Sequence, residues 1–158
     1  MSAVLAVTQP YGAGLGIQEP FVGATPAAAA NFTYACDGYG LRRFLSLVFT
    51  LTTDGNAANR YVTVEYQGKD GNAFAVGAAG VTVSASSTQR FAGSAFRGEA
   101  EWAANTDVLF PLIPLLLFPG DVLKIVVASI QAGDTLTLIR GVTERFPLDV
   151  NNLPTLEP

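Results

Sequence analysis

The sequence predicts an all-β protein, and more specifically an antiparallel β-sandwich with a jelly-roll-like arrangement of strands. Apolar and polar residues alternate in several short segments, as they do in strands that bury one face. Turn sequences rich in Gly, Asp and Asn separate these segments at intervals of roughly ten residues. No long segment has the period of an amphipathic helix. The 158 residues suffice for one domain with a core of its own.

Residues 1–40 are predicted to form an extended N-terminal arm rather than regular structure. They contain three prolines and only two charged residues, Glu19 and Asp37, and no helical or strand period persists in them. A disordered tail is usually polar and charged, which this segment is not. We therefore expect the arm to become ordered by lying on its own domain or on an adjacent subunit. The residues expected to make this interface are Val4, Leu5, Val7, Tyr11, Leu15, Ile17, Phe21 and Val22.

A β-sandwich domain is expected to span residues 41–146, and its first two strands are predicted to form a hairpin. In the segment 44–53, one parity is apolar and the other is rich in Ser and Thr, as in a strand with one buried face. The apolar set is Leu45, Leu47, Phe49 and Leu51. A turn at 54–56 follows, and the alternating segment 60–68 is then expected to return beside the first strand.

A second reversal is predicted at residues 69–72, because Asp, Gly and Asn tolerate the backbone angles of tight turns. Three weaker strand candidates follow it, at residues 73–76, 81–86 and 88–91. The segment 99–103 fits either a strand or a short helix, since it contains good helix formers.

The clearest strand signals lie in the last third of the chain. The predicted elements are a strand beginning near Val108, a turn at 119–121, a strand at 121–130, a turn at 131–134 and a final strand at 135–146. In the final strand, Leu136 and Leu138 are expected on the face opposite Ile139. Residues 147–158 contain several prolines and no basic residue, and we predict an extended C-terminal tail.

The composition is unusual for a protein whose surface faces only water. Hydrophobic residues make up 49% of the chain and charged residues 14%, against about 25% charged in typical soluble domains. We expect neighbouring subunits to cover part of the uncharged surface. A charge-poor, Ala- and Gly-rich β protein that stays monomeric would have the same composition, so that alternative stays open.

Charge and hydropathy give no reason to expect nucleic acid or a membrane as a direct partner. The net charge is −4 and the nine basic residues are scattered, whereas phosphate binding draws on clustered Lys and Arg. The apolar run at 108–118 is about half the length of a spanning helix, and Pro111 and Pro114 interrupt it. We interpret it as core or interface. The N-terminus lacks the basic region of a secretory signal.

Most catalytic and metal sites need residue types that this chain lacks, and we therefore expect no enzyme activity, no cofactor and no metal. Histidine is absent and Cys36 is the only cysteine, which excludes His-based triads and thiolate metal sites. Cys36 is predicted to be a buried or merely free thiol. Glu99 and Glu101 beside Trp102 could form a carboxylate pair at a sugar site, but a solvated face next to a core Trp is the preferred interpretation.

Four aspartates occur in turns that contain glycine. Asp side chains in such turns ordinarily accept hydrogen bonds from nearby backbone N–H groups, and no stretch has the spacing of a calcium-binding loop. We therefore assign a local structural role to Asp54, Asp70, Asp121 and Asp134.

Two segments of the chain resemble a widespread group of small bacteriophage virion proteins. The segment LRRFLSLVFTLTTDGNAANRYVTVEYQGKDGN contains an Arg-x-Leu-Ser strand, a Phe-Thr-Leu-Thr-Thr run and an Ala-Asn-Arg turn. The segment LLLFPGDVLKIVVASIQAGDTLTLIRGVTERF contains a Pro-Gly-Asp turn and a Gln-Ala-Gly-Asp turn. The corresponding residues are 43–46, 49–53, 58–60, 119–121 and 131–134. These motifs belong to strands and turns rather than to a chemical site.

The resemblance implies a virion structural protein, and a capsid decoration (cement) protein in particular. Such a protein would be made in the host cytoplasm and would then bind the major capsid protein and other copies of itself at the capsid surface, with a homotrimer favoured. The alternative is a tail, baseplate or fibre component that recognises a host surface glycan. Its candidate residues are Tyr61, Tyr66, Trp102 and the pair Glu99 and Glu101. A third hypothesis, a carboxylate-dependent glycosidase or lyase, rests on the two glutamates alone.

Overall fold

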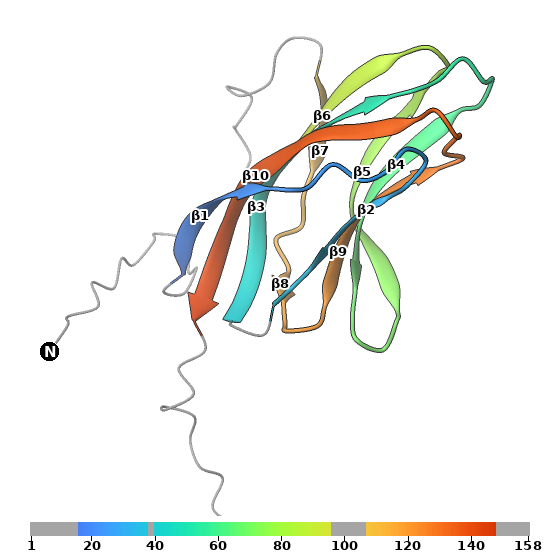
Figure 1. Cartoon of the computed structure of the whole chain (residues 1–158). Helices are drawn as coiled ribbons and strands as arrows, with labels where there is room; N and C mark the ends of the chain where they lie inside the picture. The colour runs from blue at the N-terminus through green and yellow to red at the C-terminus, as the bar shows by residue number, and fades with distance from the viewer. Residues whose placement is uncertain (1–15, 38–39, 96–106, 148–158) are drawn as a thin grey trace, which may run out of the picture.

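A computed structural model of the chain describes residues 16–37, 40–95 and 107–147, and these residues form strands, turns and loops without any helix. The strands build two packed sheets with the apolar core between them (Figure 1). The predicted all-β class is therefore confirmed. Within the described residues, no helix is long and apolar enough to cross a membrane.

Each sheet combines strands from distant parts of the sequence. The first sheet has the order β1 (Ile17–Val22), β10 (Thr135–Pro147), β3 (Gly40–Thr52), β6 (Thr88–Ser94) and β7 (Val108–Pro111), and β8 (Leu116–Leu117) also pairs with β3. The second sheet has the order β2 (Phe32–Ala35), β9 (Val122–Ala128), β4 (Arg60–Gln67) and β5 (Ala73–Val83).

The strand pairs are antiparallel as predicted, with the exception of β6 and β7, which are parallel. A parallel pair needs a crossover connection of a dozen or more residues. Residues 95–107 join these two strands and are long enough for that. The first sheet is therefore mixed at this edge, which the alternation of polar and apolar residues could not indicate.

The predicted hairpin between segments 44–53 and 60–68 is wrong. β3 and β4 belong to different sheets, and residues 53–59 cross from one sheet to the other. The links 84–87 and 129–134 cross in the same way at the same end of the molecule, on the right in Figure 1. The reversal predicted at 69–72 does form a hairpin, in which β4 and β5 pair.

The segment predicted as an N-terminal arm contains two strands of the domain. β1 pairs with β10 and β2 pairs with β9, so that the boundary expected between residues 40 and 41 falls inside β3. β1 is an edge strand, where proline is tolerated because its missing N–H would face solvent. Short edge strands that contain proline carry little periodic signal, which explains why the sequence suggested an arm.

The residues expected to form an interface differ in their exposure in the structure. Phe21 is buried in the core of its own domain, in edge-to-face contact with Phe32, Tyr34 and Phe44, so it is not available to a neighbour. Ile17 and Val22 are exposed. The other members, Val4, Leu5, Val7, Tyr11 and Leu15, lie outside the described residues, as does all of the predicted tail beyond Pro147.

Two β-bulges shift which side chains face the core. In β3, Leu47, Phe49 and Leu51 are fully buried as predicted, and Leu45 is also buried. The register with β10 shifts between Val142 and Thr143, however, and Phe44 rather than Leu45 belongs to the core cluster. In β10, a second shift gives Leu138 a φ of 52° and leaves it 65% exposed. A bulge adds one residue and so reverses the alternation beyond it. Ile139 therefore shares the core with Leu136, against the prediction.

The weak strand candidate at 73–76 and the first part of the candidate at 81–86 belong to one continuous strand, β5 (Ala73–Val83), whereas residues 84–86 lie in the link to β6. Gly77 lies inside it, where a Cβ atom would be only 2.9 Å from the Phe110 ring and from the Pro111 carbonyl oxygen. This glycine therefore marks close packing against the other sheet rather than a break between strands. The candidate at 88–91 is confirmed as β6, which continues to Ser94.

Candidate functional site

The residues considered for a sugar site are not brought together among the described residues. Glu99, Glu101 and Trp102 lie outside those residues. Tyr61 and Tyr66 are both on β4, but they are five positions apart and therefore point to opposite faces of the strand. The described structure thus offers no site built from the expected set.

The four turn aspartates make the local hydrogen bonds that the sequence predicted. Asp54 and Asp70 each accept a bond from the backbone N–H two residues further on, over 3.0 Å and 3.1 Å. Asp121 accepts one from the Phe118 N–H over 2.7 Å, and Asp134 accepts one from the Gln131 N–H over 2.8 Å. Each of these carboxylates therefore holds the shape of its own turn.

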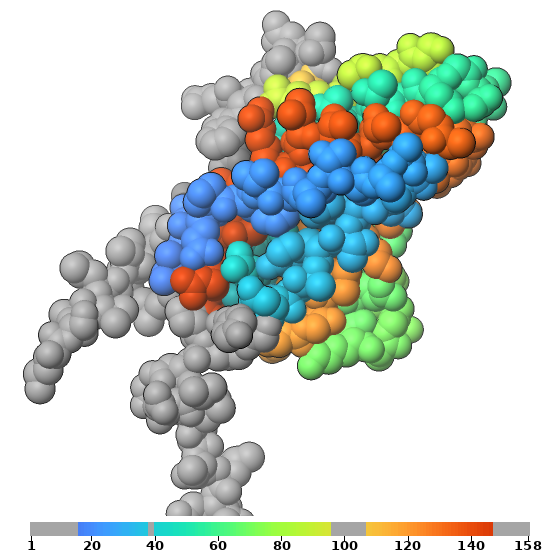
Figure 2. Space-filling model, in the orientation of Figure 1, coloured from blue at the N-terminus to red at the C-terminus, as the bar shows by residue number. Residues whose placement is uncertain are grey.

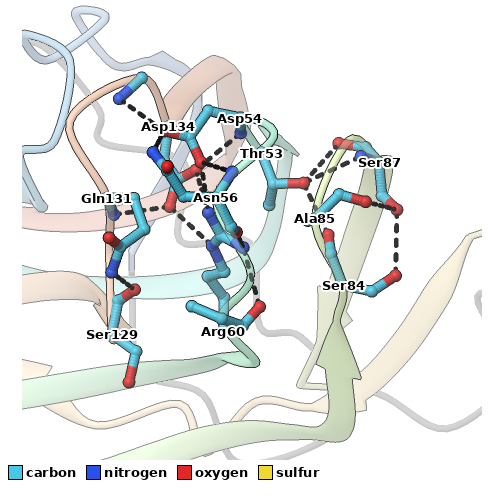
Figure 3. Close-up of polar contacts among 12 residues, drawn as sticks. Thr53, Asp54, Asn56, Arg60, Ser84, Ala85, Ser87, Ser129, Gln131 and Asp134 are labelled. Atoms are coloured by element: carbon cyan, nitrogen blue, oxygen red, sulfur yellow. Dashed lines mark hydrogen bonds and ion pairs between the residues drawn. The ribbon is translucent and has the colours of Figure 1, made fainter.

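Two of these aspartates also bind a buried arginine that the sequence analysis did not single out. Arg60, which begins β4, is completely buried. Its Nε and Nη2 atoms donate to the two carboxylate oxygens of Asp134, both over 2.9 Å, and Nη2 also donates to Asp54 over 2.6 Å (Figure 3). Nη1 donates to the carbonyl oxygens of Asn56 and Ala58. Every guanidinium nitrogen therefore has an acceptor, as a buried cation requires.

The electrostatics follow from this arrangement. Burial disfavours the charged form of Asp134, but hydrogen bonds from Arg60 and from the backbone of Asp54 and Gln131 outweigh it and hold its pKa below the usual value. The hydrogen bond to Asp134 raises the pKa of Arg60. The pair is therefore ionised at neutral pH.

The Arg60 network joins the loops that cross between the sheets. Residues 53–59 contribute Asp54, residues 129–134 contribute Asp134, and the backbone N–H of Ala29, between β1 and β2, donates to the Asp134 carbonyl oxygen. Thr53 adds the third crossing loop, because its hydroxyl bonds the Ser84 and Ser87 carbonyl oxygens and accepts from the Ser87 N–H (Figure 3). The Arg60 network and the Thr53 hydrogen bonds therefore hold the crossing loops together at this end of the molecule.

A second polar cluster ties β1, β3 and β10 together at the other end of those strands. The Nε and Nη2 atoms of Arg43 both donate to the Oε2 atom of Glu144, a carboxylate that is 1% exposed. Arg145 donates to Glu19 over 2.9 Å, and Arg42 lies 3.6 Å from the same carboxylate. The function of this cluster is again to hold strands in register.

The motifs that carry the resemblance to virion proteins therefore have structural roles. Arg43 belongs to the Arg-x-Leu-Ser strand, Arg60 to the Ala-Asn-Arg turn and Asp134 to the Gln-Ala-Gly-Asp turn, and each makes a long-range ion pair. A sequence signal for Arg60 existed, since it shares the parity of Val62 and Val64, which are buried. A cation on the apolar face of a strand predicts a buried partner.

Cys36 is a free, buried thiol, as predicted. Its Sγ atom lies 3.6 Å from the carbonyl oxygens of Gly40 and Leu117. Burial, assisted by the nearby Asp37 carboxylate, raises the pKa of the thiol, so it is a poor nucleophile at neutral pH. Within the described parts of the chain, no three Cys, Asp or Glu side chains are grouped so as to hold a metal ion.

The apolar segment at 108–118 is both core and surface. Phe110, Leu112 and Leu117 are buried, whereas Leu109 and Ile113 are each 54% exposed and Leu116 is 38% exposed. We call these last three residues the β7–β8 ridge. Large apolar side chains that stay exposed within one short segment are candidates for contact with another molecule.

Comparisons of the chain with protein-family models, with curated proteins and with solved structures return no match.

Proposed function

We propose that this chain is a bacteriophage virion structural protein, a capsid decoration protein that binds the outer shell and stabilises it through contacts between subunits. The motif resemblance described above motivates the phage assignment. The major capsid protein and further copies of the chain, arranged as a homotrimer, are the proposed partners, and the capsid surface is the proposed location.

We also propose that the two sheets form a jelly roll. If β7 and β8 are treated as additions, eight strands remain, and the order β1-β10-β3-β6 in one sheet faces β2-β9-β4-β5 in the other. In this order, each sheet alternates strands from the beginning and the end of the domain, as two nested Greek keys would. Jelly rolls are common in viral capsid domains and in lectins, and this supports an assembly or binding role.

The observation that carries the proposal is the β7–β8 ridge on a chain with few charges. Leu109, Ile113 and Leu116 lie on one short segment that is anchored to the domain by the buried side chains of Phe110, Leu112 and Leu117. An exposed apolar segment with such anchors can dock on a shell with little loss of backbone conformational entropy. The chain's 14% content of charged residues leaves few groups whose desolvation would oppose that docking.

Binding to purified, expanded and undecorated phage shells tests the proposal. The protein should sediment with the shells and raise their melting temperature, and the triple substitution Leu109→Ser, Ile113→Ser, Leu116→Ser should abolish both effects while leaving the circular dichroism unchanged. Leu138→Ser is the matched control, because Leu138 is also exposed but lies on the β10 bulge. Failure to bind shells in any state, or equal binding by the triple variant, contradicts the proposal.

A further inference from the structure

An open groove lies between the tip of the β4–β5 hairpin and the turn that precedes β9. These two segments are neighbours at the bottom of Figure 1, and Figure 2 shows them side by side on the surface, the hairpin in green and the turn in orange. The groove is shallow and open to solvent, with a volume of about 440 Å³. Its lining residues are Tyr66, Gly68, Lys69, Asp70, Asn72, Phe74, Phe118 and Asp121.

Aromatic rings form much of this lining and remain accessible. Phe74 is 51% exposed and Phe118 is 54% exposed, although rings of this size are normally buried in a core or at an interface. Tyr66 packs against Phe74 with ring centroids 5.0 Å apart and an interplanar angle of 44°. The groove therefore offers apolar ring surfaces on both of the segments that form it.

A nearly buried carboxylate supplies a polar anchor at the same place. Asp121 is 4% exposed, and its Oδ2 atom accepts hydrogen bonds from the Tyr66 hydroxyl over 2.6 Å and from the Phe118 N–H over 2.7 Å. Both bonds end on Oδ2, so Oδ1 is left for a further donor. The hydrogen bond to Asp121 raises the pKa of Tyr66 to about 12, which keeps the phenol protonated and the carboxylate fixed.

The two segments are held close enough to act as one site. Gly120 has a φ of 92°, and a Cβ atom there would lie 2.5 Å from Cε of Lys69. The Lys69 side chain therefore lies directly on the turn before β9. Asp70 is fixed on the hairpin by two bonds from Asn72, one of them from the side-chain amide over 2.6 Å. The lining of the groove thus combines carboxylates and a lysine with the aromatic rings.

The geometry points to a carbohydrate-binding site in this groove, with a saccharide ring lying on Phe74 and Phe118 and donating a hydroxyl hydrogen to Asp121. Sugars combine an apolar C–H face with hydroxyl groups that donate and accept, and the groove offers surfaces for both. Phosphate-bearing ligands fit less well, because Asp70 and Asp121 would repel them. Saccharide binding goes beyond the proposed shell contact and uses none of the β7–β8 ridge residues.

The test uses the full chain on a printed array of bacterial surface oligosaccharides, with positive signals then measured by calorimetric titration of the free oligosaccharide. Phe118→Ala and Phe74→Ala should each weaken binding by roughly tenfold or more, since each removes one stacking surface. Leu109→Ala is the matched control, as it removes an equally exposed apolar side chain outside the groove.

The outcomes separate this site from the shell contact. Saccharide binding that the two Phe substitutions weaken and Leu109→Ala does not would support the inference whether or not the protein binds shells. An array without signal, affinities that the Phe substitutions do not change, or Phe118-dependent binding to a Lys- and Arg-rich peptide instead of to sugars would overturn it.

Discussion

Replacing Asp134 by asparagine removes the charge that faces the buried Arg60 with almost no change in volume. Each carboxylate oxygen of Asp134 accepts two hydrogen bonds, Oδ1 from the Asp54 N–H and Arg60 Nη2, and Oδ2 from Arg60 Nε and the Gln131 N–H. Asparagine keeps one oxygen and places an NH₂ group at the other position. Because that group cannot accept, two buried donors lose their partner.

The expected cost follows from these contacts. Removing one partner of a buried ion pair typically costs about 3–5 kcal/mol, because the remaining charge is buried without compensation. Asp54 still pairs with Arg60 over 2.6 Å, which places the expected loss near the lower end, about 3 kcal/mol. Since roughly 1 kcal/mol shifts the melting temperature of a domain of this size by about 2–4 °C, we expect a decrease of about 10 °C.

Urea unfolding at neutral pH, followed by far-ultraviolet circular dichroism, measures this loss as a lower midpoint at an unchanged slope. Asp70→Asn is the matched control, because Asp70 makes the same local bonds to a residue two positions ahead but binds no buried cation. Its loss should be much smaller. If the two substitutions destabilise the protein equally, the ion pair between Arg60 and Asp134 does not stabilise the fold, and the structural role assigned to the Arg60 network is wrong.

Two further predictions concern acid and the β3–β10 contact. The pKa of Asp134 is lower in the folded protein than its ordinary value of 3.8, so its contribution to stability is complete above that value and is lost as the pH falls through the lower folded pKa. The urea midpoint should therefore fall more steeply between about pH 5 and pH 2 for the wild type than for Asp134→Asn. Parallel curves for the two proteins would contradict this prediction. A Cβ atom at Gly141 would overlap the Ser46 carbonyl oxygen of the neighbouring strand, whereas the nearest atom at Gly55 is 3.7 Å away. Gly141→Ala should therefore cost about 1–3 kcal/mol or more and Gly55→Ala should stay within about 0.5 kcal/mol, as measured by thermal unfolding; an unaffected Gly141→Ala would mean that the strands can separate at this point.

The sequence predicted individual strands better than it predicted their partners. β9 and β10 were predicted nearly in full because alternation and turn chemistry are local properties of the chain. The same local signals wrongly made a hairpin of the segments now seen as β3 and β4. A turn such as 54–56 has similar residues whether the next strand returns beside the first or crosses to the other sheet.

At the candidate sites, too, the sequence indicated the local contacts but not the long-range ones. The aspartates at 54, 70, 121 and 134 could be identified as turn residues, and their local hydrogen bonds are confirmed. The sequence could not show that Arg60 binds Asp134, 74 positions away, or that Phe74 and Phe118 line one groove. Neither relation leaves a periodic trace in the sequence.

By itself, then, the sequence determined the all-β class, the position of most strands and turns, and that Cys36 has no cysteine partner within the chain. The tertiary structure alone decided which sheet each strand joins, that β1 and β2 belong to the domain, and that bulges turn Leu138 outward and Ile139 inward. The physical reason is one of range. Strand formation depends on neighbouring residues, whereas sheet membership, register and buried ion pairs depend on contacts between segments far apart in the chain.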